Sequence, residues 1–75
     1  MTHPKVISAV SISDGDTVYL TSCDAWTRDV AVAELLEVED FDWRLAFARR
    51  LREVTDATLL DAVEGEFGFA QLAAA

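Results

Sequence analysis

The residues of this chain that look most like a chemical site are two aspartates around a glycine, Asp14-Gly15-Asp16. Alternating carboxylates beside a glycine could bind calcium, but an EF-hand loop needs glycine at its sixth position and glutamate at its twelfth. Counted from Asp14, glycine stands second and Ala25 stands twelfth, so the pattern fails. Turn chemistry, in which aspartate binds nearby backbone amides and glycine supplies a positive φ, accounts for the motif instead.

Cys23 is the other residue that could do chemistry, as a nucleophile. A reactive cysteine needs a base, usually a histidine, or a positively charged environment. The only histidine is His3 in the N-terminal tail, and the neighbouring Asp24 has the wrong charge to activate a thiolate. One cysteine and one histidine also cannot supply the four ligands of a structural zinc. We therefore expect a protein that is not an enzyme, with no catalytic residues, no metal and no cofactor.

The elements that must position these residues begin with two runs rich in β-branched side chains, residues 5–12 and 17–22. The Asp-Gly turn between them predicts an N-terminal β-hairpin. Residues 26–36 and 55–64 fit either a short strand or a short helix, so local patterns leave both open.

An amphipathic helix is predicted at about residues 41–54. Asp40 is suited to cap it, and carboxylates near its start and arginines near its end match the helix dipole. Its wide apolar arc comprises Phe41, Leu45 and Ala48, with Trp43, Phe47, Leu51 and Val54 beside them. The fold class is thus α+β: a small antiparallel sheet begun by the hairpin, with this one helix packed on one face.

Composition indicates one small folded domain, residues 1–75. Hydrophobic residues make up 52% of the chain and the mean hydropathy is +0.20, which is too apolar for a disordered chain. A chain of this length buries only about 60% of its unfolded surface, which leaves little room for a deep substrate pocket. We expect residues 1–4 and 70–75 to fray, after Phe67 or Phe69 has packed back on the domain.

The charge is strongly negative and unevenly distributed, with a net charge of −8 and a pI near 4.2. Five carboxylates occupy residues 34–42, whereas four of the six basic residues occupy residues 43–54. A nucleic-acid-binding domain is usually basic, so we expect no direct binding to nucleic acid. The N-terminus lacks a signal-peptide pattern and no run approaches the roughly 18 apolar residues of a membrane span, so we expect a cytoplasmic protein without membrane contact.

Five segments follow one another along the chain: KVISAV, DGDTVYLT, AWTRDVAVAELLE, an arginine-containing helix and VTDATLLDAVE. Their order resembles a small bacterial family of unknown function whose members are typically encoded beside sulfite reductase genes. The resemblance spans about residues 5–64 and is most specific in DGDTVYLT followed by AWTRD. It implies a sheet-and-helix domain with strands at residues 30–36 and 58–64, and it offers no catalytic residues to carry over.

The C-terminus departs from that family. Its members usually continue into a segment with arginines and a Gly-Pro ending, whereas this chain ends in GFAQLAAA. Without such a basic end the domain is strongly acidic, which weakens the implied association with sulfite reductase.

Two classes of function remain. The first is a non-enzymatic acidic protein-binding module, an anti-CRISPR-like nucleic-acid mimic that inhibits a nucleic-acid-binding effector by occupying its basic surface. The second is a small accessory or regulatory protein that binds sulfite reductase, as the resemblance implies. Monomer and homodimer both remain open.

The predicted contact residues are carboxylates that a basic partner would meet. They are Asp14, Asp16, Glu34, Glu37, Glu39, Asp40 and Asp42. For each of them, turn chemistry, helix-start electrostatics or simple solubility is an alternative explanation.

Overall fold

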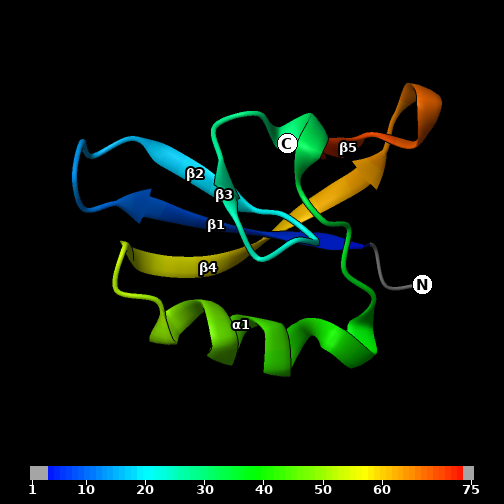
Figure 1. Ribbon diagram of the computed structural model, residues 1–75. Coiled ribbons are helices and arrows are strands. Elements are labelled where there is room, and N and C mark those ends of the chain that lie inside the picture. The colour runs from blue at the N-terminus through cyan, green and yellow to red at the C-terminus, as the bar shows by residue number, and fades with distance from the viewer. Residues whose placement is uncertain (1–3, 74–75) are drawn as a thin grey trace.

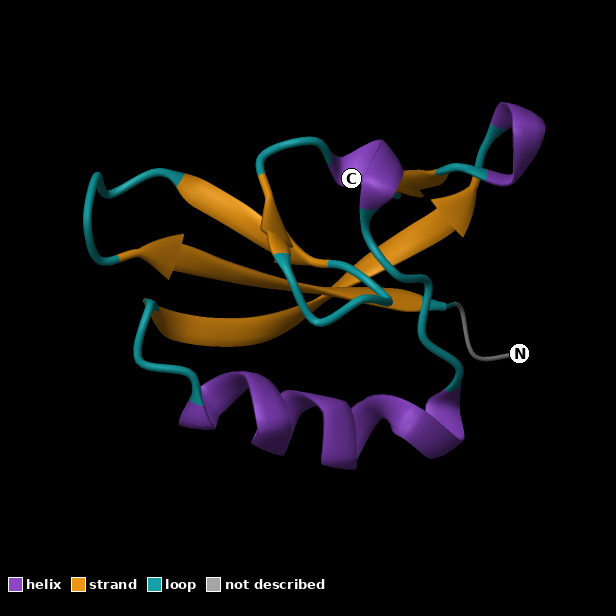
Figure 2. Ribbon diagram, viewed as in Figure 1, coloured by secondary structure: helices purple, strands orange, loops and turns teal. Residues whose placement is uncertain are grey.

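The computed structural model describes residues 4–73, which form a five-stranded antiparallel sheet and one α-helix (Figure 1). The elements are β1 (Lys5–Ser11), β2 (Thr17–Leu20), β3 (Trp26–Thr27), α1 (Phe41–Arg50), β4 (Val54–Glu64) and β5 (Ala70–Leu72). Short 3-10 helices occupy the connections (Figure 2): η1 (Val30–Val32), η2 (Val38–Asp40) and η3 (Glu66–Gly68). The predicted α+β class is confirmed.

The N-terminal β-hairpin is present as predicted. β1 pairs antiparallel with β2, with Ser8 opposite Tyr19. In the turn, Gly15 has a φ of 74°, a conformation that side chains disfavour, and its N–H donates to the carbonyl of Ser11 at 2.8 Å. The Asp-Gly sequence therefore serves turn geometry.

The strand order is β3-β2-β1-β4-β5, so the first strand of the chain lies at the centre of the sheet. Its second partner is β4, with Lys5 opposite Asp61 and Ser11 opposite Val54. The register shifts between Ser8 and Val10, as in a β-bulge, and β1 and β4 cross the middle of the molecule as its longest strands (Figure 1).

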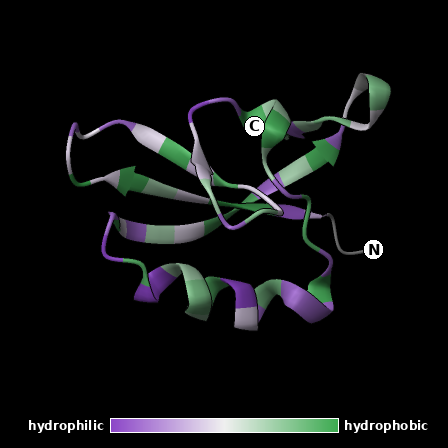
Figure 3. Ribbon diagram, viewed as in Figure 1, coloured by the Kyte–Doolittle hydropathy of each residue, from purple (hydrophilic) through white to green (hydrophobic). Residues whose placement is uncertain are grey.

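α1 covers one face of this sheet, and the larger hydrophobic core lies between them. Hydrophilic and hydrophobic residues alternate along the helix (Figure 3), and its Phe41 and Ala48 are buried in a cluster with residues of the sheet. The buried residues of this cluster are Ile7, Ala9, Val18, Leu20, Leu36, Phe41, Ala48, Val54 and Ala57. Full burial of one such aliphatic side chain contributes about 1.5–3 kcal/mol, so the helix is held mainly by this face.

A smaller core lies on the opposite face, where the segment around η1 crosses the strands (Figure 1). Its buried residues are Val6, Ala33, Ala62 and Ala70. The side chains of β1 thus serve two cores, Val6 in one and Ile7 in the other, because successive residues of a strand point to opposite faces.

The expected strand at residues 30–36 is wrong. Residues Val30–Val32 form η1, whose N-cap Asp29 accepts a hydrogen bond from the N–H of Ala31 at 3.0 Å. β2 and β4 lie along the two edges of β1, so this segment reaches the sheet only at single points. The N–H of Glu34 donates to the carbonyl of Leu20 at 3.0 Å, and Leu36 forms an isolated bridge with Lys5. The strand expected at residues 58–64 is confirmed as part of β4.

The predicted helix is four residues too long at its C-terminal end. α1 ends at Arg50, Leu51 is its C-cap with an extended ψ of 128°, and residues 52–53 form a turn. Val54 instead begins β4, where it lies opposite Ser11 and is buried in the main core. A β-branched residue with a partner strand beside it is better placed in the sheet than in another helical turn.

The C-terminal segment returns to the sheet. Residues 70–72, placed by the sequence at a frayed end, form β5 and pair with β4. We expected Phe67 or Phe69 to pack on the domain, but Phe67 is 90% exposed and Phe69 is 54% exposed, so neither lies in the core. The N-terminal tail with His3 lies outside the described residues. No helix within residues 4–73 is both long and apolar enough to cross a bilayer.

Candidate protein-binding surface

Two of the predicted contact residues, Asp14 and Asp16, lie at the hairpin tip and both bind Arg28. Arg28 Nη2 pairs with the carboxylate of Asp14, and Arg28 Nε lies 2.9 Å from Asp16 Oδ2. The backbone N–H of Asp16 donates to Asp14 at 3.1 Å and is the largest cause that holds the pKa of Asp14 below its usual value; Ser11 and Arg28 add to it. The tip therefore carries one guanidinium for two carboxylates.

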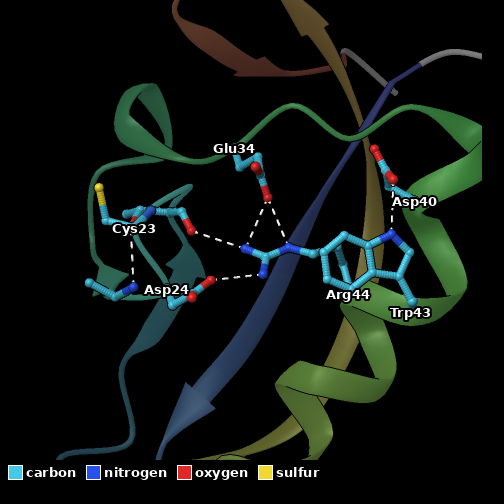
Figure 4. A network of polar contacts seen from close by, with 8 residues as sticks. Cys23, Asp24, Glu34, Asp40, Trp43 and Arg44 are labelled. Atoms are coloured by element: carbon cyan, nitrogen blue, oxygen red, sulfur yellow. Dashed lines mark hydrogen bonds and ion pairs between the residues drawn. The ribbon is translucent and has the colours of Figure 1, made fainter.

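A third predicted contact residue, Glu34, belongs to a network around Arg44 (Figure 4). Arg44 Nε donates to Glu34 Oε1 at 3.0 Å, Nη1 to Asp24 Oδ1 at 2.8 Å and Nη2 to the carbonyl oxygen of Thr21 at 3.2 Å. Three separate segments thus meet at one guanidinium: the end of β2, the chain after η1 and α1. This network orders the fold and leaves Glu34 engaged within the chain.

Arg44 is 5% exposed, and aromatic rings cover its guanidinium as well. Its Cζ lies 5.3 Å from the ring centroid of Trp43 and 5.3 Å from that of Phe47, which is within cation–π range. Sequence reasoning missed this residue because arginine is almost never buried. The signal was its spacing: Phe41, Arg44 and Ala48 stand at i, i+3 and i+7, the buried stripe of the helix.

The other four predicted residues lie at the N-cap of η2, in η2 and in the first turn of α1. Glu37, Glu39 and Asp42 are exposed, and within residues 4–73 no ion pair engages them. Asp40 occupies the N-cap position as predicted, but its backbone is already helical and its side chain makes no capping hydrogen bond. Instead Asp40 Oδ1 accepts a hydrogen bond from Trp43 Nε1 at 2.9 Å (Figure 4).

Trp43 lies on the surface, although the sequence placed it in the apolar arc of the helix. Its side chain is 57% exposed, and Val38 in the same stretch is 58% exposed. Residues 37–43 thus combine two exposed apolar side chains with three unpaired carboxylates, and we name them the acidic-aromatic surface. Sequence reasoning identified its charges and missed its aromatic centre.

Cys23 and groups of side chains that could bind a metal ion are the remaining candidates for site chemistry. Cys23 is exposed, and its N–H donates to Thr21 Oγ1 at 3.3 Å within the turn after β2. Within residues 4–73, no three His, Cys, Asp or Glu side chains are grouped so that they could hold a metal ion. Trp26, the aromatic residue after that turn, is half-buried and packs against the main core.

The fold and this surface define a small α+β module with exposed carboxylates near an exposed tryptophan in the chain. Over residues 5–73 the chain matches the model of a family described as a protein of unknown function (DUF2849), and it belongs to that family. The match begins at β1 and extends past β5, so it covers every strand and α1. No curated protein and no solved structure matched the chain.

Proposed function

We propose that the protein is a non-enzymatic module that binds a protein partner with a basic surface through its acidic-aromatic surface. The observation that carries the proposal is Trp43, a large side chain that is more than half exposed and is nevertheless held by a 2.9 Å hydrogen bond to Asp40. Tryptophan is among the residues that most often dominate the energy of protein interfaces. A ring already fixed in the free protein loses little conformational entropy on binding.

The carboxylates around this ring favour a basic partner. Glu37, Glu39 and Asp42 are exposed, no ion pair within residues 4–73 engages them, and the formal net charge of the chain is −8. Such charges accelerate association with a positively charged surface and disfavour acidic partners. Their contribution is screened by salt over about 8 Å at physiological ionic strength, whereas the contribution of the indole is not.

The geometry favours a compact interface over broad mimicry of a nucleic-acid backbone. A mimic would present many free carboxylates, but Asp14, Asp16 and Glu34 are engaged with arginines of the chain itself. The remaining charges stand within a few residues of the exposed Val38 and Trp43, and a specific protein interface likewise combines apolar and polar side chains. The first partner to test is therefore sulfite reductase, which the family resemblance implies, and the second is a nucleic-acid-binding effector.

Replacement of the indole tests the proposal. We expect Trp43→Ala to weaken partner binding by about 30-fold, the equivalent of about 2 kcal/mol at an interface hot spot. The measurement is calorimetry or surface plasmon resonance with the sulfite reductase of the same organism, and in a second arm with a nucleic-acid-binding effector complex. Because the Trp43 ring also lies over the guanidinium of Arg44, circular dichroism must first show that Trp43→Ala is folded.

Phe67→Ala is the matched control, because Phe67 is also an exposed aromatic residue but lies in the β4–β5 connection. It should bind as tightly as the unchanged protein. Equal affinity of Trp43→Ala and Phe67→Ala for a partner that binds the unchanged protein would refute the assignment of residues 37–43. Binding to the effector alone would favour the inhibitor over the accessory protein.

A further inference from the structure

A second site lies at the other end of α1, where the β1–β2 turn and the α1–β4 connection come together (Figure 1). The structure has a cavity there of about 370 Å³. The N–H of Ile12 donates to the carbonyl of Glu53 at 3.0 Å, so the two connections are joined by a backbone hydrogen bond. The volume falls at the small end of the range of about 300–1,000 Å³ for ligand-binding clefts.

The cavity has an apolar lining that extends the main core. Val18 and Val54 are buried, Trp26 is half-buried, and Ile12 is exposed beside them. The ring of Trp26 is held by its packing against the core, and its Nε1–H is buried without an acceptor among residues 4–73. This lining suits a small apolar or aromatic group.

Two charged residues of opposite sign, Arg52 and Glu53, also line the cavity. Both are exposed and stand next to each other in the turn after α1. Arg28 and Arg44 are engaged in ion pairs, but no ion pair within the described residues engages Arg52 or Glu53. The lining therefore includes one cationic and one anionic residue beside its apolar side chains.

We propose that this cavity binds a free α-amino acid with an apolar side chain. Arg52 would face the α-carboxylate, Glu53 the α-ammonium group, and the side chain would lie against Trp26 and the valines. A simple anion would meet Glu53 unfavourably and a simple cation would meet Arg52 unfavourably, so the zwitterion complements the charges best. A ligand of this size and an open site predict a Kd on the order of 1 mM.

The test is a titration of ¹⁵N-labelled protein followed by NMR, with three probes that share one ring. L-Phenylalanine has both charges, 3-phenylpropanoate has the carboxylate alone, and phenethylamine has the ammonium alone. We expect L-phenylalanine to give saturable shifts of the Trp26 indole N–H and of the amides around residues 12 and 53. The analogues should bind about threefold to fivefold more weakly, as loss of one exposed charge contact implies. The Trp43 indole should not shift.

Two variants assign the charges. Arg52→Gln should weaken the binding of L-phenylalanine and 3-phenylpropanoate but not that of phenethylamine. Glu53→Gln should weaken the binding of L-phenylalanine and phenethylamine but not that of 3-phenylpropanoate. Arg50→Gln is the matched control, because Arg50 is exposed nearby but does not line the cavity. Absence of saturable shifts, equal binding of all three probes, or the same losses in Arg50→Gln would overturn the proposal. Such a failure would leave the surface at residues 37–43 untouched.

Discussion

Two arginines of this protein each bind two carboxylates, yet their surroundings differ. At the hairpin tip, Arg28 holds Asp14 and Asp16 with a side chain that is 64% exposed. In the core network, Arg44 holds Asp24 and Glu34 with a side chain that is 7% exposed. The same ion-pair chemistry is therefore placed once in water and once inside the fold.

The difference lies in what each guanidinium would lose. Arg28 would recover hydration if its partners were removed, so its pairs contribute little net free energy. Arg44 has given up water on nearly all sides and relies on two carboxylates, a backbone carbonyl and two aromatic rings. Its partners would in turn lose the charge that compensates them. The Arg28 cluster lies on the surface of a turn, whereas the Arg44 cluster joins α1 to the turn after β2.

The largest effect is expected at Arg44. Arg44→Met keeps much of the side-chain volume but removes the charge, and it should lower the free energy of unfolding by about 2–3 kcal/mol. This is below the about 3–5 kcal/mol of a fully buried pair because Asp24 and Glu34 remain partly exposed. Urea denaturation followed by circular dichroism measures the change.

Arg44→Lys sharpens this result. Lysine restores the charge but not the planar fork that reaches three acceptors, so only part of the lost stability should return. A methionine variant as stable as the unchanged protein would contradict the view that the network orders the fold.

A smaller effect is expected at Arg28. Arg28→Met should lower the free energy of unfolding by no more than about 1 kcal/mol. The loss should shrink further at high salt, because exposed charges are screened. Urea denaturation of Arg28→Met and Arg44→Met at low and high ionic strength compares the two sites directly. Equal losses in the free energy of unfolding would contradict the proposed difference between them.

The smallest effect concerns the pH dependence of the hairpin tip. The pKa of Asp14 is lowered from its ordinary value of 3.8, chiefly by the N–H of Asp16, so ionised Asp14 stabilises the folded state. This contribution is complete above that value and is lost as the pH falls through the lower pKa of the folded state. The stability difference between the unchanged protein and Asp14→Asn should therefore be constant above about pH 5 and shrink in acid.

Chemical denaturation at a series of pH values measures this difference. Asp42→Asn serves as the control for the change in net charge, since no ion pair engages Asp42 in the described residues. A difference for Asp14→Asn that grows as the pH falls would have the wrong sign.

The sequence was sufficient where local chemistry alone decides the structure. Asp14-Gly15-Asp16 between β-branched runs predicted the hairpin, and the carboxylates before Phe41 marked the start of α1. The end of the helix was not predicted because Leu51 and Val54 continue the helical period. The strand residue that pairs with Val54 is Ser11, more than forty residues earlier in the chain. The predicted strand at residues 30–36 was wrong for a related reason. Whether β1 has an edge free to pair with this segment depends on the arrangement of the whole sheet.

The candidate surface was predicted by its charges and not by its shape. Composition shows that residues 34–42 are acidic, but it does not show which carboxylates the chain uses for itself. Arg44 binds Glu34, and Arg28 binds the two aspartates of the hairpin tip. These contacts join residues 10 to 14 positions apart in the chain. Trp43 was misplaced because a helical arc drawn from the sequence is wider than the stripe that meets the sheet.

The central position of β1 also has a consequence for synthesis of the chain. Its partner β4 ends at Glu64, and Lys5 pairs with Asp61, so the chain must be synthesised past Asp61 before these two strands can pair fully. The β1–β2 hairpin needs only neighbouring residues and can form earlier. Contacts of such long sequence separation slow folding. The nascent protein must therefore wait with one edge of its central strand open, the state in which it is most exposed to other strands.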